Sequence, residues 1–263
     1  MANSPRKVLV TGSAGRIGRA AVRALVAAGH DVTGLDRVPT PGLPPTHGLV
    51  GDLGDFGLLS AACADKDVVV HLAACPDDAP EPSWDKPAGD NFLSQLVPAN
   101  LVGPYQLMEA CRRAVVPRVV LASTGQVIDG HLESQNVPVT ATSSYQPRYL
   151  YACTKMFLEG LGQVYSRWHG LTVLAVRFGW CPRDAGQVAE IAADPQAQDV
   201  FLSPGDAGRF VTACVEAEKL PPYAVAYAVS RFVHASQYDL GPAERLLGYT
   251  PQDQWPTGAE EFA

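Results

Sequence analysis

The chain lacks the sequence features of three classes of protein. It has no run of Lys or Arg, and its 263 residues carry a formal net charge of −7 with a pI of about 5.3. We therefore expect no nucleic-acid or anionic-membrane surface. Its apolar runs are too short to cross a bilayer. The N-terminus has no apolar stretch between the Arg6–Lys7 pair and Gly12, which argues against a signal peptide.

Cysteine is present but is not arranged for a disulfide framework or a zinc site. No CxxC pair occurs, and most of the cysteines lie in apolar segments with helix-like or strand-like patterns. We therefore expect buried free thiols, a cytoplasmic location and no metal. The six are Cys63, Cys75, Cys111, Cys153, Cys181 and Cys214.

What the chain does contain is an alternation of short apolar runs with helical patterns. With 47% hydrophobic and 18% charged residues, the composition is that of a globular protein, and the length suits one large α/β domain. The alternation predicts parallel βαβ units, and hence a Rossmann-type doubly wound parallel sheet. We expect strands over residues 7–12, 31–36, 67–74, 118–124 and 171–179, and helices over 18–30, 58–64, 100–114 and 149–168.

Two segments depart from this alternation. Beyond residue 179 the sequence mixes Pro, Gly, Asp and Gln, before a predicted helix over 206–218 and a predicted strand over 223–230. We expect residues 1–178 to form the Rossmann domain and 179–263 to form a small substrate lobe in the same compact unit. The Pro- and Asp-rich residues 75–91 predict a loop, either a lid beside the ligand crevice or a solvated insertion.

The stretch VTGSAGRIG places Gly12, Gly15 and Gly18 between a predicted strand and a predicted helix. A turn with this spacing requires residues without a Cβ atom, and the free N–H groups of the following helix attract a pyrophosphate. We interpret it as a dinucleotide-binding turn, and the alternative is a purely structural turn.

Acidic residues after the next strands extend this interpretation. Asp36 ends the second predicted strand, where a carboxylate accepts hydrogen bonds from the adenosine ribose and repels a 2′-phosphate, so NAD is favoured over NADP. The adjacent Arg37 weakens that preference and leaves the use of both cofactors open. Asp52 and Leu53 are candidate adenine contacts, although the same residues are also typical of a turn.

Tyr151 and Lys155 are four residues apart, so they share one face of the predicted helix over 149–168. A tyrosine with a pKa near about 10 is a poor base at neutral pH. A lysine ammonium and a nicotinamide cation beside it would stabilise the phenolate. The strand over 118–124 ends with Ser123 and Thr124, which offer a hydroxyl to polarise a substrate oxygen. Without this context, the pair is an ordinary feature of an amphipathic helix.

An ordered set of motifs resembles the pattern of the extended short-chain dehydrogenase/reductase family. The set comprises the glycine turn, HLAA at 71–74, Asn100, Ser123–Thr124, Tyr151 with Lys155, and LLGYTP at 246–251.

The resemblance implies Tyr151 as the acid/base, Lys155 as its partner and Thr124 as the hydroxyl. It also implies that Asn100 orders a kinked helix and a relay water, against the alternative of a helix cap near Pro98. The resemblance implies a homodimer through the two long helices that start near Asn100 and Tyr149. The remaining candidate cofactor contacts are Arg16, Ile17, Leu72, Ala73, Ala74 and Phe178.

Within that family, the length of the chain, RFGWCP at 177–182 and LGYTPQD at 247–253 are similar to the uronate dehydrogenase group. This implies NAD-dependent oxidation of the C1 hydroxyl of a uronate, aldose or sugar phosphate to a lactone. A nucleotide-sugar epimerase and a non-catalytic dinucleotide sensor remain as alternatives.

Two departures from the group concern the substrate. Trp180 stands where the group has a small polar residue, and Thr124-Gly125 stands where it has Ser-Asn. The candidate substrate contacts are Ser123, Gln126, Trp180 and Arg183, with Arg209 as a second candidate to bind a substrate anion.

Overall fold

Seven parallel strands form a single sheet in the computed structural model, which describes residues 4–76, 91–134 and 137–262. The strand order is β3-β2-β1-β4-β5-β6-β7, and every neighbouring pair is parallel. The predicted doubly wound sheet is confirmed. The strands are β1 (Lys7–Thr11), β2 (Asp31–Asp36), β3 (Gly48–Val50), β4 (Val68–His71), β5 (Arg118–Thr124), β6 (Thr172–Phe178) and β7 (Tyr223–Ala228).

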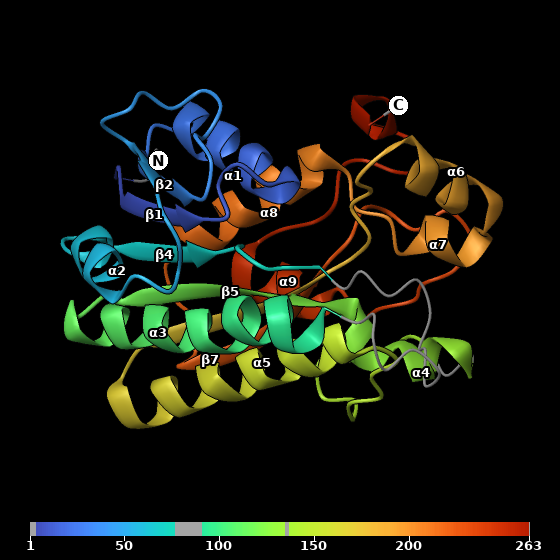
Figure 1. The fold of residues 1–263 in the computed structure, drawn as a ribbon. Coiled ribbons are helices and arrows are strands. Elements are labelled where there is room, and N and C mark those ends of the chain that lie inside the picture. Colours follow the sequence, from blue (N-terminus) through green and yellow to red (C-terminus); the bar gives the residue numbers. More distant parts are fainter. Residues whose placement is uncertain (1–3, 77–90, 135–136, 263) are drawn as a thin grey trace.

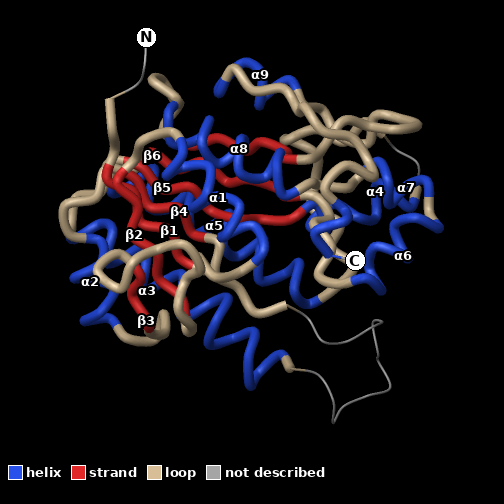
Figure 2. The backbone as a smooth tube through the Cα atoms, turned by 90° about the horizontal axis from the view of Figure 1, so that it is seen from above, coloured by secondary structure: helices blue, strands red, loops and turns tan. Residues whose placement is uncertain are grey.

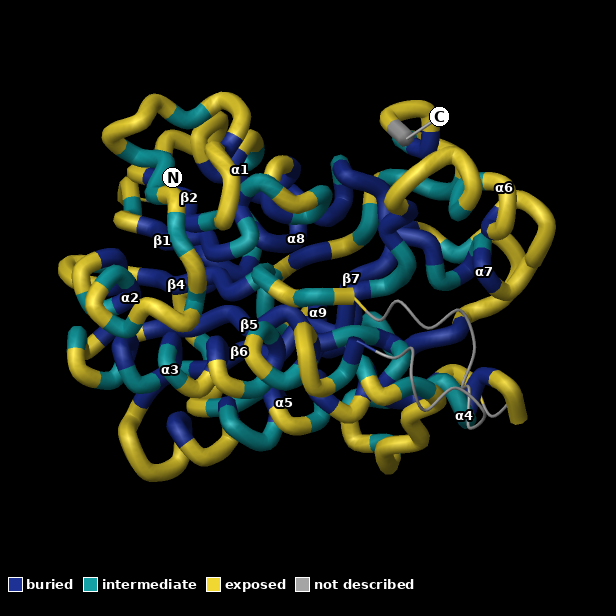
Figure 3. The backbone as a smooth tube through the Cα atoms, viewed as in Figure 1, coloured by how far each residue is buried: buried dark blue, intermediate teal, exposed yellow. Residues whose placement is uncertain are grey.

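Helices cover both faces of the sheet (Figure 1). On one face lie α1 (Arg16–Ala27), α8 (Pro204–Glu216) and α9 (Gly241–Leu247); on the other lie α2 (Phe56–Cys63), α3 (Gly103–Arg113) and α5 (Leu150–His169). Successive side chains along β1 point alternately to the two helical layers. Val8 and Val10 pack with α1 and α8, whereas Leu9 packs with α2, α3 and α5. Figure 3 shows the resulting buried strands between exposed outer helix faces.

Short helices gather beyond the carboxyl ends of the strands, and Figures 1 and 2 both show α4, α6 and α7 together at that end of the molecule. Apolar residues from this region, including Ile191 and Phe201, form a small core of their own with Trp180 packed against it. The elements are η2 (Gly125–Ile128), α4 (Asp129–Glu133), α6 (Ala185–Ala193), α7 (Pro195–Asp199) and η3 (Ala259–Phe262).

The expected boundary after residue 178 separates elements that the fold keeps together. β7 pairs with β6 in the same sheet, and α8 packs against α1. Both lie in the segment 179–263, so part of the predicted lobe belongs to the sheet and its helical layer. For the other residues of 179–263, a separate substrate lobe stays a prediction. The loop predicted at 75–91 falls mostly outside the described residues.

The largest difference in secondary structure concerns the helix expected over 100–114. The structure has a π-helix, η1 (Phe92–Val102), followed directly by α3. Pro98 lies inside η1 and cannot donate a backbone hydrogen bond, while its own carbonyl accepts one from Gly103 N. Three further elements were not predicted. The strand β3 has only three residues, which give too short a pattern, and the helices α6 and α7 are capped at their starts by Asp184 and Asp194.

The cysteines follow expectation only in part. Four are buried, namely Cys63, Cys111, Cys181 and Cys214, but Cys75 is half-buried and Cys153 is exposed on α5, so the expectation of burial is wrong for these two. None of the six forms a disulfide in the described structure. Within the described parts of the chain, no helix is both long enough and apolar enough to span a bilayer.

A buried ion pair joins α5 to the sheet. Glu159 on α5 accepts hydrogen bonds from Arg177 Nε and Nη2, both at 2.9 Å, and both side chains are almost completely buried. Ser123 Oγ and Tyr145 Oη donate to the same carboxylate at 2.5 and 2.8 Å. Arg177 Nη1 donates in turn to Tyr227 Oη at 2.8 Å. The pair raises the pKa of Arg177 against the opposing effect of burial.

Glu159→Gln should destabilise the protein strongly, because it leaves the Arg177 guanidinium buried without an anion. Breaking a buried pair in this way costs about 3–5 kcal/mol. The free energy of unfolding in urea measures the loss. Asp65→Asn is the matched control, because it removes an anion from the exposed Lys7–Asp65 pair and should change stability little. Equal, small effects of both variants would contradict the structural role assigned to Glu159.

Candidate active site

Two positions of the glycine turn between β1 and α1, Gly12 and Gly18, leave no room for a side chain. Gly12 has a φ of +69°, and a Cβ atom there would lie 2.5 Å from the backbone N of Ala73. A Cβ atom on Gly18 would overlap with the carbonyl oxygen of Gly12. Gly15 is the N-cap residue of α1 and has no side chain that could bond to the first amides of the helix. The first N–H groups of α1, including those of Arg16 and Ile17, are therefore open to an anion, as a pyrophosphate requires.

Asp36 lies directly beside this turn. Its Oδ2 atom accepts a hydrogen bond of 3.0 Å from Ala14 N, and its Oδ1 atom a longer one of 3.4 Å from Val38 N. The carboxylate at the end of β2 is thus held beside the glycine turn, where an adenosine ribose would lie. Arg37 is exposed. The residues present fit a dinucleotide.

The other candidate cofactor contacts differ in their geometry. Asp52 is exposed and accepts a hydrogen bond from Gly54 N, as in a turn, whereas Leu53 packs against Gly103 at the start of α3. Leu72 N bonds to Thr11 O as the chain leaves β4, so Leu72 and Ala73 border the turn at Gly12, and Ala74 is exposed. Phe178 is buried in the core, where its ring packs edge-on against Phe210.

Tyr151 and Lys155 both lie near the start of α5. Lys155 is almost fully buried, and its Nζ atom donates to Ala122 O at 2.8 Å while lying 5.4 Å from the centre of the Tyr151 ring. Burial lowers the pKa of Lys155 to about 8. Burial also raises the pKa of Tyr151 to about 12, against the opposing charges of Arg16 and Arg183. Tyr151 alone is thus a neutral phenol, and it needs cations beside it to act as a base.

The two hydroxyls at the end of β5 have different partners. Ser123 is buried and donates its hydroxyl hydrogen to Glu159, so this hydroxyl is engaged inside the fold and not with a substrate. Thr124 is half-buried and accepts a weak bond of 3.3 Å from the amide of Gln126, which lies next to it on η2. A Cβ atom on Gly125 would lie 2.5 Å from Tyr238 Oη, which explains why a larger residue is missing there.

Asn100 joins η1 to the other segments of the site. Its Oδ1 atom accepts from Cys75 N at 2.8 Å, and its Nδ2 atom donates to Cys75 O at 2.9 Å and to Thr154 Oγ1 at 3.3 Å. The side chain caps no helix, so the alternative of a cap near Pro98 is wrong. Asn100 instead connects the chain after β4 with the helix that carries Tyr151.

The candidate anion-binding residues are not equivalent. Arg209 is bonded to both Asp206 and Asp253, so its charge is already neutralised. Arg183 is exposed, and its charge acts on Tyr151. Trp180 donates to Gln187 and packs on the small core with Phe201, so it is mainly a packing residue. The sequence did not single out Cys181, whose thiol is buried near the half-buried Arg16; burial raises the pKa of this thiol to about 11, and the charge of Arg16 opposes the increase.

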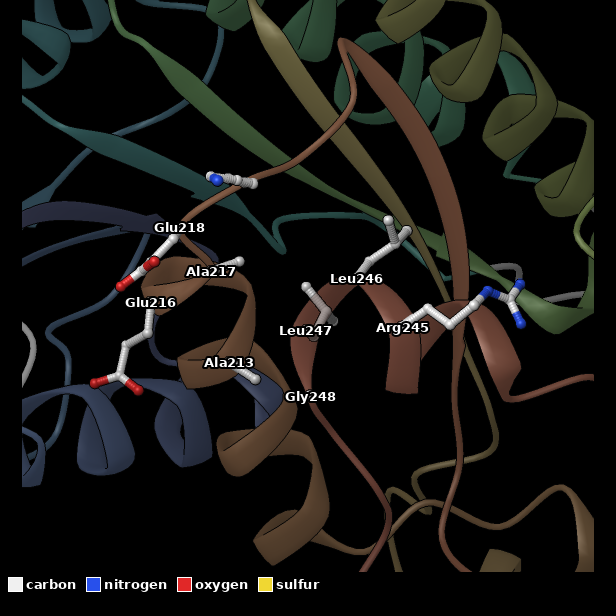
Figure 4. A pocket seen from close by; sticks show the side chains of 9 residues that line it. Ala213, Glu216, Ala217, Glu218, Arg245, Leu246, Leu247 and Gly248 are labelled. Carbon is white, nitrogen blue, oxygen red and sulfur yellow. The ribbon is translucent and has the colours of Figure 1, made fainter. Parts of the chain in front are cut away.

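A surface pocket of about 590 Å³ lies away from these residues (Figure 4). Its lining includes Glu216, Glu218 and Leu247, at the ends of α8 and α9. Arg118, the first residue of β5, donates to carbonyls at the end of α8. The pocket is therefore at the amino edge of the sheet, opposite the edge that holds Tyr151.

Comparisons with known proteins agree with the geometry. Residues 8–179 match the model of the NAD dependent epimerase/dehydratase family. The chain is 31% identical to an L-arabinose 1-dehydrogenase (NAD(P)(+)) of Haloferax volcanii, over 97% of this chain and 99% of the relative. It is 26% identical to an NAD-dependent glucose-6-phosphate dehydrogenase of the same organism, over 94% and 93%.

A solved structure supports the same relationship. The glucuronic acid dehydrogenase of Chromohalobacter salexigens superposes with a TM-score of 0.73 at 28% identity, over 98% of this chain and 88% of that one. The family match spans the glycine turn, β4, β5, Tyr151 and Lys155, which are the segments that meet at the carboxyl edge of the sheet. On this evidence, the chain belongs to the NAD dependent epimerase/dehydratase family.

Proposed function

We propose that this protein is an NAD-dependent dehydrogenase that oxidises the C1 hydroxyl of a sugar to a lactone. The observation that carries the proposal is the Tyr151–Lys155 pair, held at the edge of the sheet where the glycine turn would bind a dinucleotide. Relatives across nearly the whole chain are named as sugar dehydrogenases, including one that acts at position 1 of arabinose. The substrate class is therefore an aldose, a uronate or a sugar phosphate.

The chain's own residues supply the proton chemistry. A bound NAD would supply the acceptor for the hydride that leaves C1. Tyr151 Oη takes the proton of the sugar hydroxyl, and the Lys155 ammonium stabilises the phenolate that this requires. Because the pKa of Lys155 is about 8, the ammonium remains mostly protonated at neutral pH. Thr124 holds the substrate oxygen, and Asn100 keeps the segment after β4 in place beside α5.

The protein would hold NAD and the substrate with separate residues. The amides of the glycine turn would bind the pyrophosphate, and Asp36 would bind the adenosine ribose, which favours NAD over NADP. Arg183 and Gln126 are exposed or half-buried near the predicted centre and are the proposed substrate contacts. The scattered free cysteines support a cytoplasmic location.

We further infer a homodimer formed through η1, α3 and α5. The face of α5 opposite Tyr151 carries exposed apolar side chains, among them Phe157 and Trp168, which are 42% and 71% exposed. Val102 and Tyr105 extend the apolar surface onto the neighbouring segment. Exposed apolar areas of this kind mark interaction surfaces, and a second copy would bury them.

Formation of NADH from NAD across a panel of aldoses, uronates and sugar phosphates tests the proposed activity. We expect at least one sugar to give NADH and a lactone in equal amounts. An epimerase would convert a nucleotide sugar without net NADH. If no sugar of the panel gives NADH and a nucleotide sugar is converted, the proposal is refuted in favour of an epimerase.

Tyr151→Phe should lower kcat by about 10²- to 10⁴-fold, the usual contribution of a general acid or base. NAD affinity, measured by calorimetry, should change little, because the phenol hydroxyl acts on the substrate. Tyr149→Phe removes a hydroxyl only two residues away and should retain near wild-type turnover. If Tyr151→Phe also retains it, Tyr151 is not the acid/base.

Asp36→Ala should raise kcat/KM with NADP relative to that with NAD. The substitution removes a carboxylate that repels a 2′-phosphate and that bonds the ribose. Steady-state kinetics with both cofactors at one sugar concentration measures the ratio. Asp52→Ala, which alters a carboxylate in an exposed turn, serves as the control. An unchanged ratio in Asp36→Ala would remove this residue from the cofactor site.

Val164→Asp should shift the protein from dimer to monomer, because it places a charge in the apolar face of α5. Val26 on α1 has the same exposure, 49%, so Val26→Asp is a matched control that should remain dimeric. Light scattering after size-exclusion chromatography measures the mass. A monomeric wild type, or a dimer unaffected by Val164→Asp, would contradict the proposed interface.

A further inference from the structure

His71, the last residue of β4, has a ring nitrogen with no hydrogen-bond partner in the part of the chain that the structure describes. Its Nδ1 atom lies 2.7 Å from Thr11 Oγ1, and the whole residue is 1% exposed. Its Nε2 atom is buried and has no hydrogen-bond partner among the described residues. A buried polar atom of this kind is costly unless it is satisfied, often by an ordered water.

The register of the sheet places this atom near Lys155. His71 pairs with Leu121 of β5, and the next residue of β5, Ala122, provides the carbonyl that accepts from Lys155 Nζ. Alternation along β4 sends His71 to the same side as Val69, whose apolar cluster contains Leu158 of α5. His71 therefore faces the layer that contains Lys155.

The His71 side chain has a definite charge state at neutral pH. Burial, aided by the charge of Lys155, lowers the pKa of His71 to about 3, so the imidazole is neutral throughout the working range. A neutral imidazole has one donor and one acceptor nitrogen. The positive charge beside it favours the lone pair on Nε2, so Nδ1–H is the donor to Thr11 Oγ1.

The Lys155 ammonium has N–H groups that the Ala122 carbonyl does not use, and further acceptors would stabilise its charge. An ammonium has three N–H groups, and the Ala122 carbonyl accepts from one of them. Burial favours loss of its proton, which would remove the charge that stabilises the Tyr151 phenolate. Each further acceptor bonded to the ammonium opposes that loss.

We propose that His71 is a positioning residue of the catalytic centre, whose Nε2 atom accepts a hydrogen bond from the Lys155 ammonium through one bound water and thereby keeps Lys155 protonated. The proposal rests on the proposed function for its catalytic meaning. Among the described residues, the other ionisable groups around the centre are Tyr151 on α5, Cys75 after β4, Arg16 on α1 and Arg183 after β6.

Two substitutions separate the nitrogens of His71. His71→Asn places an amide where Nδ1 was, so it can retain the bond to Thr11 and removes the Nε2 acceptor. His71→Gln places a carboxamide near the former Nε2 position, so an acceptor remains while the bond to Thr11 is lost. The chain has five lysines, so NMR titration of carbon-labelled lysine, with Lys155 assigned by Lys155→Met, follows this group directly.

His71→Asn should lower the pKa of Lys155 by about one pH unit, as expected for loss of a hydrogen bond to a charged group. His71→Gln should leave it near the wild-type value. In the wild type itself, the measured pKa should lie above about 8, the value set by burial. A wild-type value well below 8, an unchanged Lys155 in His71→Asn, or equal shifts in both variants would overturn the proposal.

The kinetic consequence has a defined sign. With an active sugar, His71→Asn should move the alkaline limb of the kcat profile to lower pH by the same amount, whereas a purely structural defect would lower kcat at every pH without moving that limb. The NMR titration uses no substrate. A wild-type protein that oxidises no sugar would therefore refute the proposed function while the Lys155 titration still decides the role of His71.

Discussion

The Glu159 carboxylate fixes the position of α5 on the sheet. It accepts two hydrogen bonds from Arg177 of β6, one from Ser123 of β5 and one from Tyr145. A carboxylate and a guanidinium removed from water are costly unless their hydrogen-bonding groups are satisfied. Sliding or rotating α5 by one residue would leave both charges unpaired. The pair therefore selects one register of the helix against β5 and β6.

That register determines where Tyr151 and Lys155 lie. The three residues Tyr151, Lys155 and Glu159 follow one another at intervals of four, so they share one face of the helix. Once Glu159 is fixed, Lys155 meets the Ala122 carbonyl and Tyr151 comes to the carboxyl edge of the sheet. The opposite face of α5 is left with the exposed side chains of Phe157, Val164 and Trp168, where we propose contact with a second copy. One helix thus presents the proposed catalytic pair on one side and an apolar surface on the other.

The parts of the structure that depend on local pattern could be predicted from the sequence. Glycine spacing and β-branched runs are local signals. They predicted the glycine turn between β1 and α1 and the strands at Asp31–Asp36 and Arg118–Thr124. The pairing of Tyr151 with Lys155 on one helical face followed from spacing alone.

The features that were missed depend on contacts distant in sequence. Nothing near Ser123 indicates that its hydroxyl meets Glu159, and nothing near Trp180 indicates packing on Phe201. The π-helix around Pro98 gives no distinct periodicity, so η1 was missed. The position of Glu159 in the sequence does indicate the buried ion pair. Glu159 continues the stripe of Tyr151 and Lys155, and a lone acid on a buried helix face predicts a buried cation such as Arg177.

Transfer of a deuterium label tests the central claim most directly. The protein would be incubated with NAD and with L-arabinose, D-glucuronate or glucose 6-phosphate carrying deuterium at C1. Oxidation at C1 predicts that the deuterium appears on the nicotinamide ring, in an amount equal to the lactone formed, and that the label does not exchange with water. Deuterium retained in the sugar, or NADH formed without the label, would contradict oxidation at C1.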